Sequence, residues 1–272
     1  MFSDIGIDLG TAKTVVSTEK SIALIEPSVV LMDTYDEVPV KFGRYAQRAV
    51  GRSTDRYNAV CPIERGVIAD YDVAEHMLDN YLSRVIANKI TKPRAVVSIP
   101  CGATAVERRS VIDAVQNAGI RSVCTIESPV ASALGMGIDF SKPHGSIVVD
   151  IGAGNTDVAV LSMGSMARAE TTRIGGVDID DAIIKYLKRE FNLLVGQGTA
   201  AAIKHQIGGA IPRSVEIAMV AKGMSLTTGL PASEEITAEQ VREAISDVID
   251  GICFAIQNVV NNTPPELVGD IS

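Results

Sequence analysis

A short motif occurs twice in this chain, about half a chain apart. Residues 5–16 read IGIDLGTAKTVV and residues 147–158 read IVVDIGAGNTDV. The matched pairs are Asp8 with Asp150, Gly10 with Gly152, Thr14 with Thr156, and Val16 with Val158. Each copy starts as an apolar β-branched strand, turns at Asp-x-Gly and continues into a second strand-like run. The repeat therefore predicts two related halves, each built on a strand–turn–strand hairpin.

The glycines of both turns point to anion binding. Glycine lets the backbone approach phosphate oxygens closely, and a turn directs consecutive N–H groups at an anion. Two better-known phosphate loops are excluded, because Gly152 and Gly154 lead into a strand instead of a helix and because no G-x-x-x-x-G-K-[ST] string occurs. A plain hairpin turn would explain one copy, whereas two matched copies favour a phosphate clamp.

A carboxylate ends the first strand of each copy. These carboxylates belong to Asp8 and Asp150. Mg²⁺ prefers oxygen ligands, keeps several waters and normally accompanies nucleotide phosphates. We therefore expect the two aspartates to hold Mg²⁺ through water.

Composition excludes several classes of function. The formal net charge of −8 is unfavourable for non-specific nucleic-acid binding, so we expect no nucleic-acid partner. The four cysteines are scattered without a CxxC pair, so neither a metal cluster nor a disulfide framework is expected. No apolar run approaches the ~20 residues of a membrane span, and the N-terminus shows no secretory signal, so a cytoplasmic protein is expected.

Strand-like and helix-like segments alternate along the chain, which predicts an α/β fold with parallel strands. The expected helices span residues 72–87, 104–119, 129–136, 178–191 and 199–207, and a further helix starts at Thr237. The expected strands include residues 95–100, 122–126 and 214–228. The helix that follows Thr237 carries one apolar stripe, formed by Val241, Ile245, Val248, Ile252, Ile256 and Val259, and this stripe is expected to face a core.

Several longer strings resemble the MreB/Mbl family of bacterial actin-like proteins. They are DIGIDLGTAKT, GVIADYDVAEHML, VERRSVIDAV, VVDIGAGNTDVAV and NNTPPELVGDI, and together they run from Asp4 to Asp270. The paired hairpins alone would suggest only the wider superfamily of actin, Hsp70 and sugar kinases. The resemblance implies an actin-like, ribonuclease H-like duplicated two-domain fold with ATP or ADP and Mg²⁺ between the halves. It also implies membrane-associated filaments that organise cell-wall synthesis and rod shape.

The resemblance further implies four subdomains. Residues 1–31 and 65–140 would form the first domain core, with 32–64 as its smaller subdomain. Residues 141–177 and 242–272 would form the second core, with 178–241 as its smaller subdomain. The family continues beyond the position of Ser272 with a strand, a glycine-rich adenosine loop and a closing helix. The second core is therefore expected to be C-terminally incomplete, with part of the apolar stripe exposed.

Site residues follow from the same resemblance. The first phosphate loop would be Gly10, Thr11, Ala12 and Lys13, and the second Gly152, Ala153, Gly154 and Asn155. Lys204 matches a lysine on a nucleotide-contacting helix, and Ala201 stands where the family has a glutamate facing the ribose and base. Asp8 and Asp150 match the metal-side carboxylates.

Three departures from the family concern hydrolysis. Ser128 stands at the glutamate that orients the attacking water, and Asn155 stands at a threonine near that water. Lys13 replaces an asparagine of the first loop. The resemblance implies an ATP-hydrolysing protein, but these replacements predict slow or absent turnover.

Three functions are compatible with these observations. The first is a filament-forming protein that uses nucleotide as a switch. The second is a degenerate, non-hydrolysing paralogue that acts as a partner or cap of a full-length MreB. The third is a small-molecule kinase, which is less well supported because we find no base for a substrate hydroxyl. Besides the chain itself or a paralogue, the expected partners are the cell-wall elongation machinery and, weakly, the inner face of the cell membrane, through Phe2 and Ile90 with Lys89, Lys92 and Arg94 beside Ile90.

Overall fold

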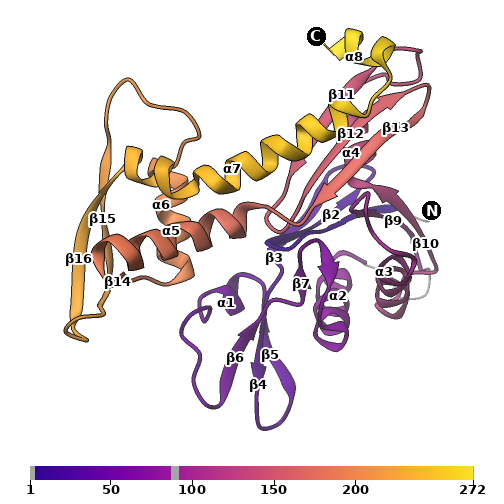
Figure 1. The fold of residues 1–272 in the computed structure, drawn as a ribbon. Coiled ribbons are helices and arrows are strands. Elements are labelled where there is room, and N and C mark those ends of the chain that lie inside the picture. The colour runs from indigo at the N-terminus through magenta and orange to yellow at the C-terminus, as the bar shows by residue number, and fades with distance from the viewer. Residues whose placement is uncertain (1–3, 87–91, 272) are drawn as a thin grey trace. The chain divides into compact units, whose positions relative to one another are not determined.

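The structure is a computed structural model, and it describes residues 4–86 and 92–271 (Figure 1). The chain forms two compact units. The first unit consists of Met1–Arg173 together with Ala255–Ser272, and the second of Ile174–Phe254. The finer division into four subdomains stays a prediction.

The first unit contains a five-stranded sheet with the order β10-β9-β1-β2-β3. Its strands are β1 (Ile5–Leu9), β2 (Lys13–Thr18), β3 (Ile22–Pro27), β9 (Arg94–Ile99) and β10 (Ser122–Glu127). The strand β1 forms an antiparallel hairpin with β2 and pairs in parallel with β9, which in turn pairs in parallel with β10. This mixed sheet, with helices in its crossovers, confirms the predicted α/β class.

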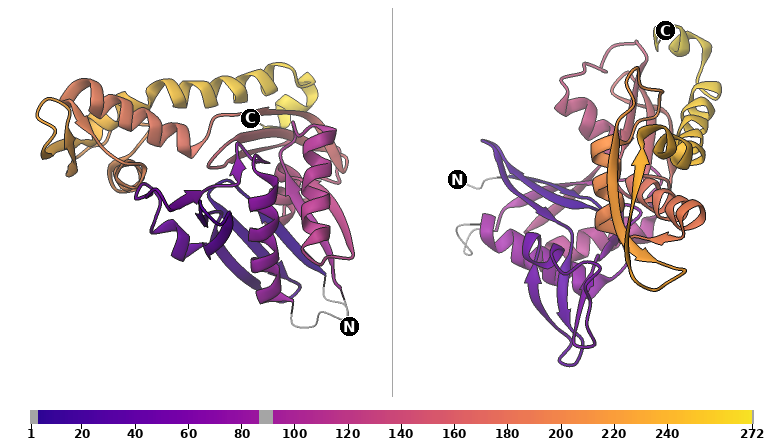
Figure 2. Two further views of the ribbon diagram at one scale, coloured as in Figure 1. Left: turned by 90° about the horizontal axis from the view of Figure 1, so that it is seen from below. Right: turned by 90° about the vertical axis from the view of Figure 1, so that its left-hand side faces the viewer.

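Two helices pack side by side on this sheet, α2 (Tyr71–Val85) and α3 (Ala105–Asn117) (Figure 2). Alternate residues of β1 are buried beneath them, since a strand directs every second side chain to one face. The helix α3 begins with the predicted capping box, in which the Thr104 N–H donates to Glu107 at 2.7 Å and the Glu107 N–H donates to Thr104 Oγ1 at 3.2 Å.

The second hairpin lies in a three-stranded sheet of the same unit, with the order β11-β12-β13. Its strands are β11 (Ser146–Ile151), β12 (Thr156–Ser162) and β13 (Ser165–Thr172). The helix α4 (Ser128–Gly135) packs against one face, while α8 (Pro265–Ile271) and the end of α7 (Ala238–Asn261) pack against the other. All of β12 is therefore buried.

Short elements complete the first unit. They are β4 (Val30–Asp33), β5 (Val38–Phe42) and β6 (Tyr57–Val60), which form a small sheet beside α1 (Arg44–Gln47), and the two-stranded hairpin of β7 (Ile63–Glu64) and β8 (Val67–Ile68). Figure 1 shows the small sheet in violet. The β7–β8 hairpin matters for the site, because its turn lies against both repeated loops.

The second unit has its own core. The helices α5 (Gly176–Phe191) and α6 (Gln197–Ile207) and the start of α7 pack on a sheet of β14 (Leu193–Leu194), β15 (Ala218–Ser225) and β16 (Pro231–Thr237). Only Ala218–Ser225 is strand within the expected 214–228 segment. The buried side chains include Ile183, Leu187, Ile203 and Ile236.

The apolar stripe of α7 is core along its length. Val241, Ile245, Ile252 and Val259 are buried, and Val248 and Ile256 are half-buried. The expectation that part of this stripe would be exposed is wrong, because none of its six residues is exposed. The start of the stripe packs in the core of the second unit, and its end packs beside β12 in the first. Among the helices of the described chain, α7 included, none is long and apolar enough to span a bilayer.

Candidate phosphate-binding site

The two repeated hairpins have the same turn. The Gly10 N–H donates to the Lys13 carbonyl at 3.1 Å, and the Gly152 N–H donates to the Asn155 carbonyl at 2.9 Å. The strand register is the same too, because Leu9 lies opposite Thr14 and Ile151 lies opposite Thr156. The repeat in the sequence is thus a repeat in three dimensions, with the backbone of each loop closed at equivalent positions.

Neutral hydroxyl groups support the first loop. The Ser28 hydroxyl donates to the Gly10 carbonyl at 2.6 Å and lies 2.9 Å from the hydroxyl of the buried Thr14. The Ser28 N–H also donates to the Ala12 carbonyl at 3.1 Å. Sequence reasoning missed Ser28, whose role depends on contacts across 14 to 18 residues of chain.

A buried carboxylate supports the second loop. Asp157 is 1% exposed and accepts hydrogen bonds from Cys101 N–H at 3.0 Å, Thr171 Oγ1 at 2.5 Å and Asn155 Nδ2 at 2.8 Å. Burial raises the pKa of Asp157, while the hydrogen bonds from Thr171 and Cys101 act in the opposite direction. Asp157 was also missed. Its signal in the sequence was a carboxylate immediately before the apolar run of 158–161.

The loops meet at the turn between β7 and β8. The Gly66 N–H donates to Thr11 Oγ1 at 3.0 Å. A Cβ atom on Gly66 would lie 2.6 Å from Asn155 Oδ1, and one on Gly154 would lie 2.5 Å from Thr11 Oγ1 and 2.8 Å from the Arg65 Cα. The structure therefore brings Thr11, Gly154 and Asn155 together, and glycine is required where the backbones approach so closely.

The two strand-end carboxylates each accept a hydrogen bond from a serine. Ser98 Oγ donates to Asp8 at 2.8 Å, and Ser132 Oγ donates to Asp150 at 3.0 Å. The Asp8 side chain reaches solvent, but the surrounding protein removes part of its hydration and thereby raises its pKa. The negative charge of Asp150 raises the pKa further, and the positive charge of Lys13 lowers it. Asp8 and Asp150 therefore lie within electrostatic range of each other.

This donor set fits a hydrated Mg²⁺ ion. Both carboxylates supply the hard oxygen atoms that Mg²⁺ prefers. Within residues 4–86 and 92–271, no group of three or more acidic, histidine or cysteine side chains could hold a metal ion. Asp8 and Asp150 would therefore have to share the ion with water and phosphate oxygens, as proteins commonly do for Mg²⁺.

The two candidate catalytic residues both have internal partners. Ser128 begins α4, and its hydroxyl donates to the Ile99 carbonyl at 3.0 Å. The Asn155 amide donates to Asp157. Glu127, next to Ser128, forms an ion pair with Arg108 at 3.0 Å. The three side chains are held by their neighbours, and their parts in hydrolysis stay predictions.

The remaining candidates are distributed over both units. Ala12 and Lys13 are exposed and Ala153 is half-buried in the first unit, whereas Ala201 and Lys204 lie on α6 in the second. Lys204 Nζ lies 2.9 Å from Asp180 Oδ1 and donates to the Gly176 carbonyl at 2.7 Å. Lys204 thus ties α6 to the start of α5, and contact of either α6 residue with a nucleotide stays a prediction.

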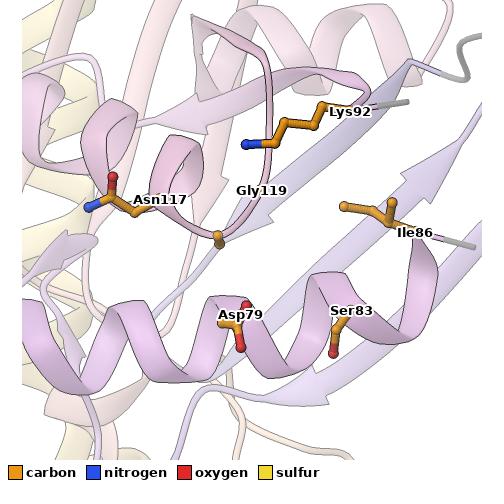
Figure 3. Close-up of a pocket in the computed structure, with 7 residues that line it drawn as sticks. Asp79, Ser83, Ile86, Lys92, Asn117 and Gly119 are labelled. Atoms are coloured by element: carbon orange, nitrogen blue, oxygen red, sulfur yellow. The ribbon is translucent and has the colours of Figure 1, made fainter. Parts of the chain in front are cut away.

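A pocket of about 160 Å³ lies away from these loops, between the C-terminal parts of α2 and α3 (Figure 3). It is lined by Asp79, Ser83, Ile86, Lys92, Asn117, Ala118 and Gly119. Lys92 and Gly119 precede the parallel strands β9 and β10, whereas the first loop follows the carboxyl end of β1. Because open α/β sheets bind ligands at the carboxyl ends of their strands, this pocket is not part of the candidate site. Phe2 and Ile90 lie outside the described residues.

Comparisons with known proteins agree with this geometry. The family model described as MreB/Mbl protein matches residues 2–272. The Escherichia coli K12 protein named "Cell shape-determining protein MreB" is 39% identical over 280 residues, which cover 100% of this chain and 81% of that protein. MreB5 of Spiroplasma citri, crystallised with AMPPNP, is 30% identical with a TM-score of 0.94, over 99% of this chain and 82% of that one.

A more distant structure shows the fold alone. The MamK double helical filament superimposes with a TM-score of 0.82 at 20% identity, over 99% of this chain and 83% of that chain. The predicted actin-like fold is confirmed by this likeness together with that to MreB5. The family match spans nearly the whole chain, including both hairpins and the β7–β8 turn between them. The chain belongs to the MreB/Mbl family.

Proposed function

We propose that this chain is an actin-like protein that binds ATP or ADP through its two repeated loops and takes part in determining cell shape. The observation that carries the proposal is that two equally closed loops lie against one turn: Thr11 accepts from the Gly66 N–H, and Gly154 lies against the backbone of Arg65. Two relatives support it. The Escherichia coli protein is named for cell shape, and MreB5 of Spiroplasma citri was crystallised with AMPPNP and with ADP.

Each part of the site has a role in this proposal. The backbone N–H groups of residues 11–13 and 153–155 would hold phosphate oxygens, as turns do in other anion sites, while Gly10 and Gly152 close the two turns. The Lys13 ammonium is exposed and adds positive charge beside the first loop. Asp8 and Asp150 would hold Mg²⁺ through water, and the ion would supply charge to neutralise the phosphates. Ala201 and Lys204 would contribute from α6.

Assembly is the second part of the proposal. We expect the chain to associate with copies of itself or with a full-length paralogue, and to act with the cell-wall elongation machinery at the inner face of the membrane. The fold that it shares with the MamK filament is compatible with such assembly. Phe2 and Ile90 stay the predicted membrane contacts.

Nucleotide binding can be tested with a matched pair of glycine variants. Gly154→Ala introduces a Cβ atom 2.5 Å from Thr11 Oγ1, so we expect it to lower the affinity for a fluorescent ATP analogue by at least about tenfold. Gly135→Ala places the same atom in open space on α4 and should leave the affinity unchanged. Titration by fluorescence anisotropy measures both. Equal affinities for Gly154→Ala and the unmodified protein would place the nucleotide elsewhere.

A non-hydrolysing paralogue is the second candidate, and it rests on the residue at position 128. Ser128 stands where the family has a charged water-orienting side chain, and its hydroxyl is already bonded to the Ile99 carbonyl. A serine is shorter than a glutamate and carries no charge, so it is poorly suited to hold a water in line with the γ-phosphorus. Glu127 is held by Arg108 and is not a ready substitute.

We therefore expect the unmodified protein to release phosphate very slowly even when ATP is bound. The double variant Ser128→Glu with Asn155→Thr should release it at least about tenfold faster, because lost positioning groups commonly cost on the order of 10²–10⁴ in rate. A coupled phosphate assay at saturating ATP measures this, with the affinity of each protein determined separately. If the unmodified protein hydrolyses ATP as fast as the variant, the inference about Ser128 is wrong.

A further inference from the structure

The pocket between the C-terminal parts of α2 and α3 is large enough for a small solute (Figure 3). Its volume of about 160 Å³ is roughly ten times the 10–15 Å³ that one water molecule requires. Ile86 and Ala118 give part of its lining an aliphatic character, and the other side chains that line it are polar or charged. A ligand of this pocket would therefore combine a short aliphatic chain with polar groups.

The wall formed by α2 offers hydrogen-bond acceptors. Asp79 and Ser83 are four residues apart on this helix, so they lie on the same face. The Asp79 carboxylate is exposed and has no hydrogen-bond or ion-pair partner within residues 4–86 and 92–271. Ser83 Oγ donates its proton to the Asn80 carbonyl at 2.9 Å, so its remaining capacity is to accept. A ligand group on this side would have to be a donor.

The end of α3 adds to this acceptor character. The Asn117 amide nitrogen donates to the Tyr71 hydroxyl at 3.3 Å, whereas the amide oxygen accepts from no residue of the described chain. The C-terminus of a helix carries a partial negative charge, and α3 ends at this wall. Gly119 has open space where a side chain would be, so its backbone leaves room beside the acceptors. An ammonium group, with three donors and a positive charge, matches this side of the pocket.

The opposite side of the pocket carries one positive charge. The Lys92 side chain enters from the segment that leads into β9, and Figure 3 shows it across the pocket from Asp79. Its ammonium has no hydrogen-bond or ion-pair partner among the residues that the structure describes, so the charges of Lys92 and Asp79 do not neutralise each other in an ion pair. A lysine ammonium has three donors and no acceptor, so it suits an anionic group such as a carboxylate or a phosphate.

We propose that this pocket binds a small zwitterion, in which a short aliphatic chain separates an ammonium group from a carboxylate or phosphate group. Lys92 holds the anionic group. Asp79, Ser83 and Asn117 accept hydrogen bonds from the ammonium group. The pocket lies at the amino ends of β9 and β10, so this ligand binds apart from the candidate phosphate loops, with or without nucleotide.

Three probes of similar chain length test this assignment on the whole chain. ε-Aminocaproate carries both charges, caproate carries only the negative charge and hexylamine carries only the positive charge. Ligand-observed NMR titrations at low ionic strength, where exposed charges are least screened, give the three affinities. We expect ε-aminocaproate to bind the unmodified protein at least about fivefold more tightly than either singly charged probe, because it makes one additional charged contact.

Two variants separate the two ends of the ligand. Asp79→Asn removes the charge on the α2 side, so it should abolish the preference for ε-aminocaproate over caproate while caproate still binds. Lys92→Met removes the charge on the other side, so it should abolish the preference over hexylamine while hexylamine still binds. Both side chains are exposed, so neither change disturbs the core. Lys41→Met, which removes an exposed lysine charge from β5 of the same unit, should change none of the affinities.

The assignment is wrong if ε-aminocaproate binds no more tightly than the singly charged probes, or if its preference survives both variants. A zwitterionic phospholipid presents the same pair of charges, and flotation with phosphatidylethanolamine vesicles distinguishes its headgroup from a free solute. A loss of vesicle binding of at least about threefold in Asp79→Asn identifies the headgroup, because removing a negative charge does not weaken a purely basic membrane contact. Vesicle binding that is unchanged in Asp79→Asn, with ε-aminocaproate bound as expected, identifies a free solute.

Discussion

The two repeated hairpins have the same backbone geometry but different surroundings. Ile7 and Leu9 of β1 are 3% and 6% exposed, whereas their counterparts Val149 and Ile151 of β11 are 37% and 55% exposed. The strand β1 pairs with β2 on one edge and β9 on the other, while among the described residues β11 pairs with β12 alone. The second loop therefore has the same geometry as the first, although the side chains of the strand that leads into it are much more exposed.

The supports beneath the loops differ in a corresponding way. The first loop rests on the hydroxyls of Thr14 and Ser28 above a well-covered sheet. The second loop rests on the single carboxylate of Asp157. This carboxylate accepts one hydrogen bond from Asn155 of the loop itself and one each from Cys101 and Thr171, which lie elsewhere in the chain. We conclude that burial of β1 stabilises the first hairpin, and that a local polar network carries a larger share of this task in the second.

The largest expected effect comes from removing that network. Asp157→Ala leaves the Cys101 N–H, the Thr171 hydroxyl and the Asn155 amide without their acceptor, so it should lower the free energy of unfolding by about 2–4 kcal/mol. The matched change at the support of the first loop, Ser28→Ala, should cost about 1 kcal/mol. Urea unfolding followed by circular dichroism measures both. Asp157→Asn, which keeps an acceptor oxygen, should lie between them. Equal costs for Asp157→Ala and Ser28→Ala would remove the distinction between the supports.

A smaller effect, dependent on pH, is expected at Asp8. Its pKa is raised chiefly by the surrounding protein, with a contribution from Asp150, so the folded state takes up a proton more readily than the unfolded state. The resulting stabilisation is present at low pH and is lost as the pH rises through the folded pKa. Asp8→Asn should therefore raise the melting temperature at pH 7, by less than about 2 °C, and by less at pH 4.

The control for this measurement is Asp113→Asn, which changes a half-buried carboxylate paired with Arg109. It should lower the melting temperature slightly or leave it unchanged at pH 7. In the Asp8→Asn variant, Ser98 can still donate to the side-chain amide oxygen, so the hydrogen bond at 2.8 Å is not lost with the charge. A fall in melting temperature for Asp8→Asn at pH 7 would show that its charge stabilises the free protein.

The smallest effect is expected when the first loop is made to resemble the second. Lys13→Asn removes an exposed charge without touching the Gly10–Lys13 backbone bond. The affinity for AMPPNP should fall about threefold at low ionic strength, and the difference should shrink as salt screens the charge. Isothermal titration at two salt concentrations measures this. A loss of affinity that does not depend on salt would mean that Lys13 acts through shape and not through charge.

Much of the fold could be predicted from local patterns. The α3 capping box, the parallel strands β9 and β10 and the apolar stripe of α7 are encoded by residues close together in the sequence. The two loops were also predictable, because the repeat is visible as a string. Their supports were not, since Ser28 acts across at least 14 residues and Asp157 receives its donors from Cys101 and Thr171. Contacts of this kind depend on which strand ends meet, which one sequence does not reveal.

The closing bonds of both turns have a consequence for how this protein can change over generations. Each bond joins an N–H to a carbonyl, so the side chain at the fourth position of the turn takes no part in it. Lys13 and Asn155 occupy that position in the two copies. A mutation at Lys13 alters the charge offered to a ligand while the loop keeps its backbone bond, whereas a mutation at Asn155 also removes a hydrogen bond to Asp157. The duplication thus gives natural selection two positions at which a side chain can change while both turns keep the same closing backbone bond. The two copies can therefore diverge in chemistry at different rates.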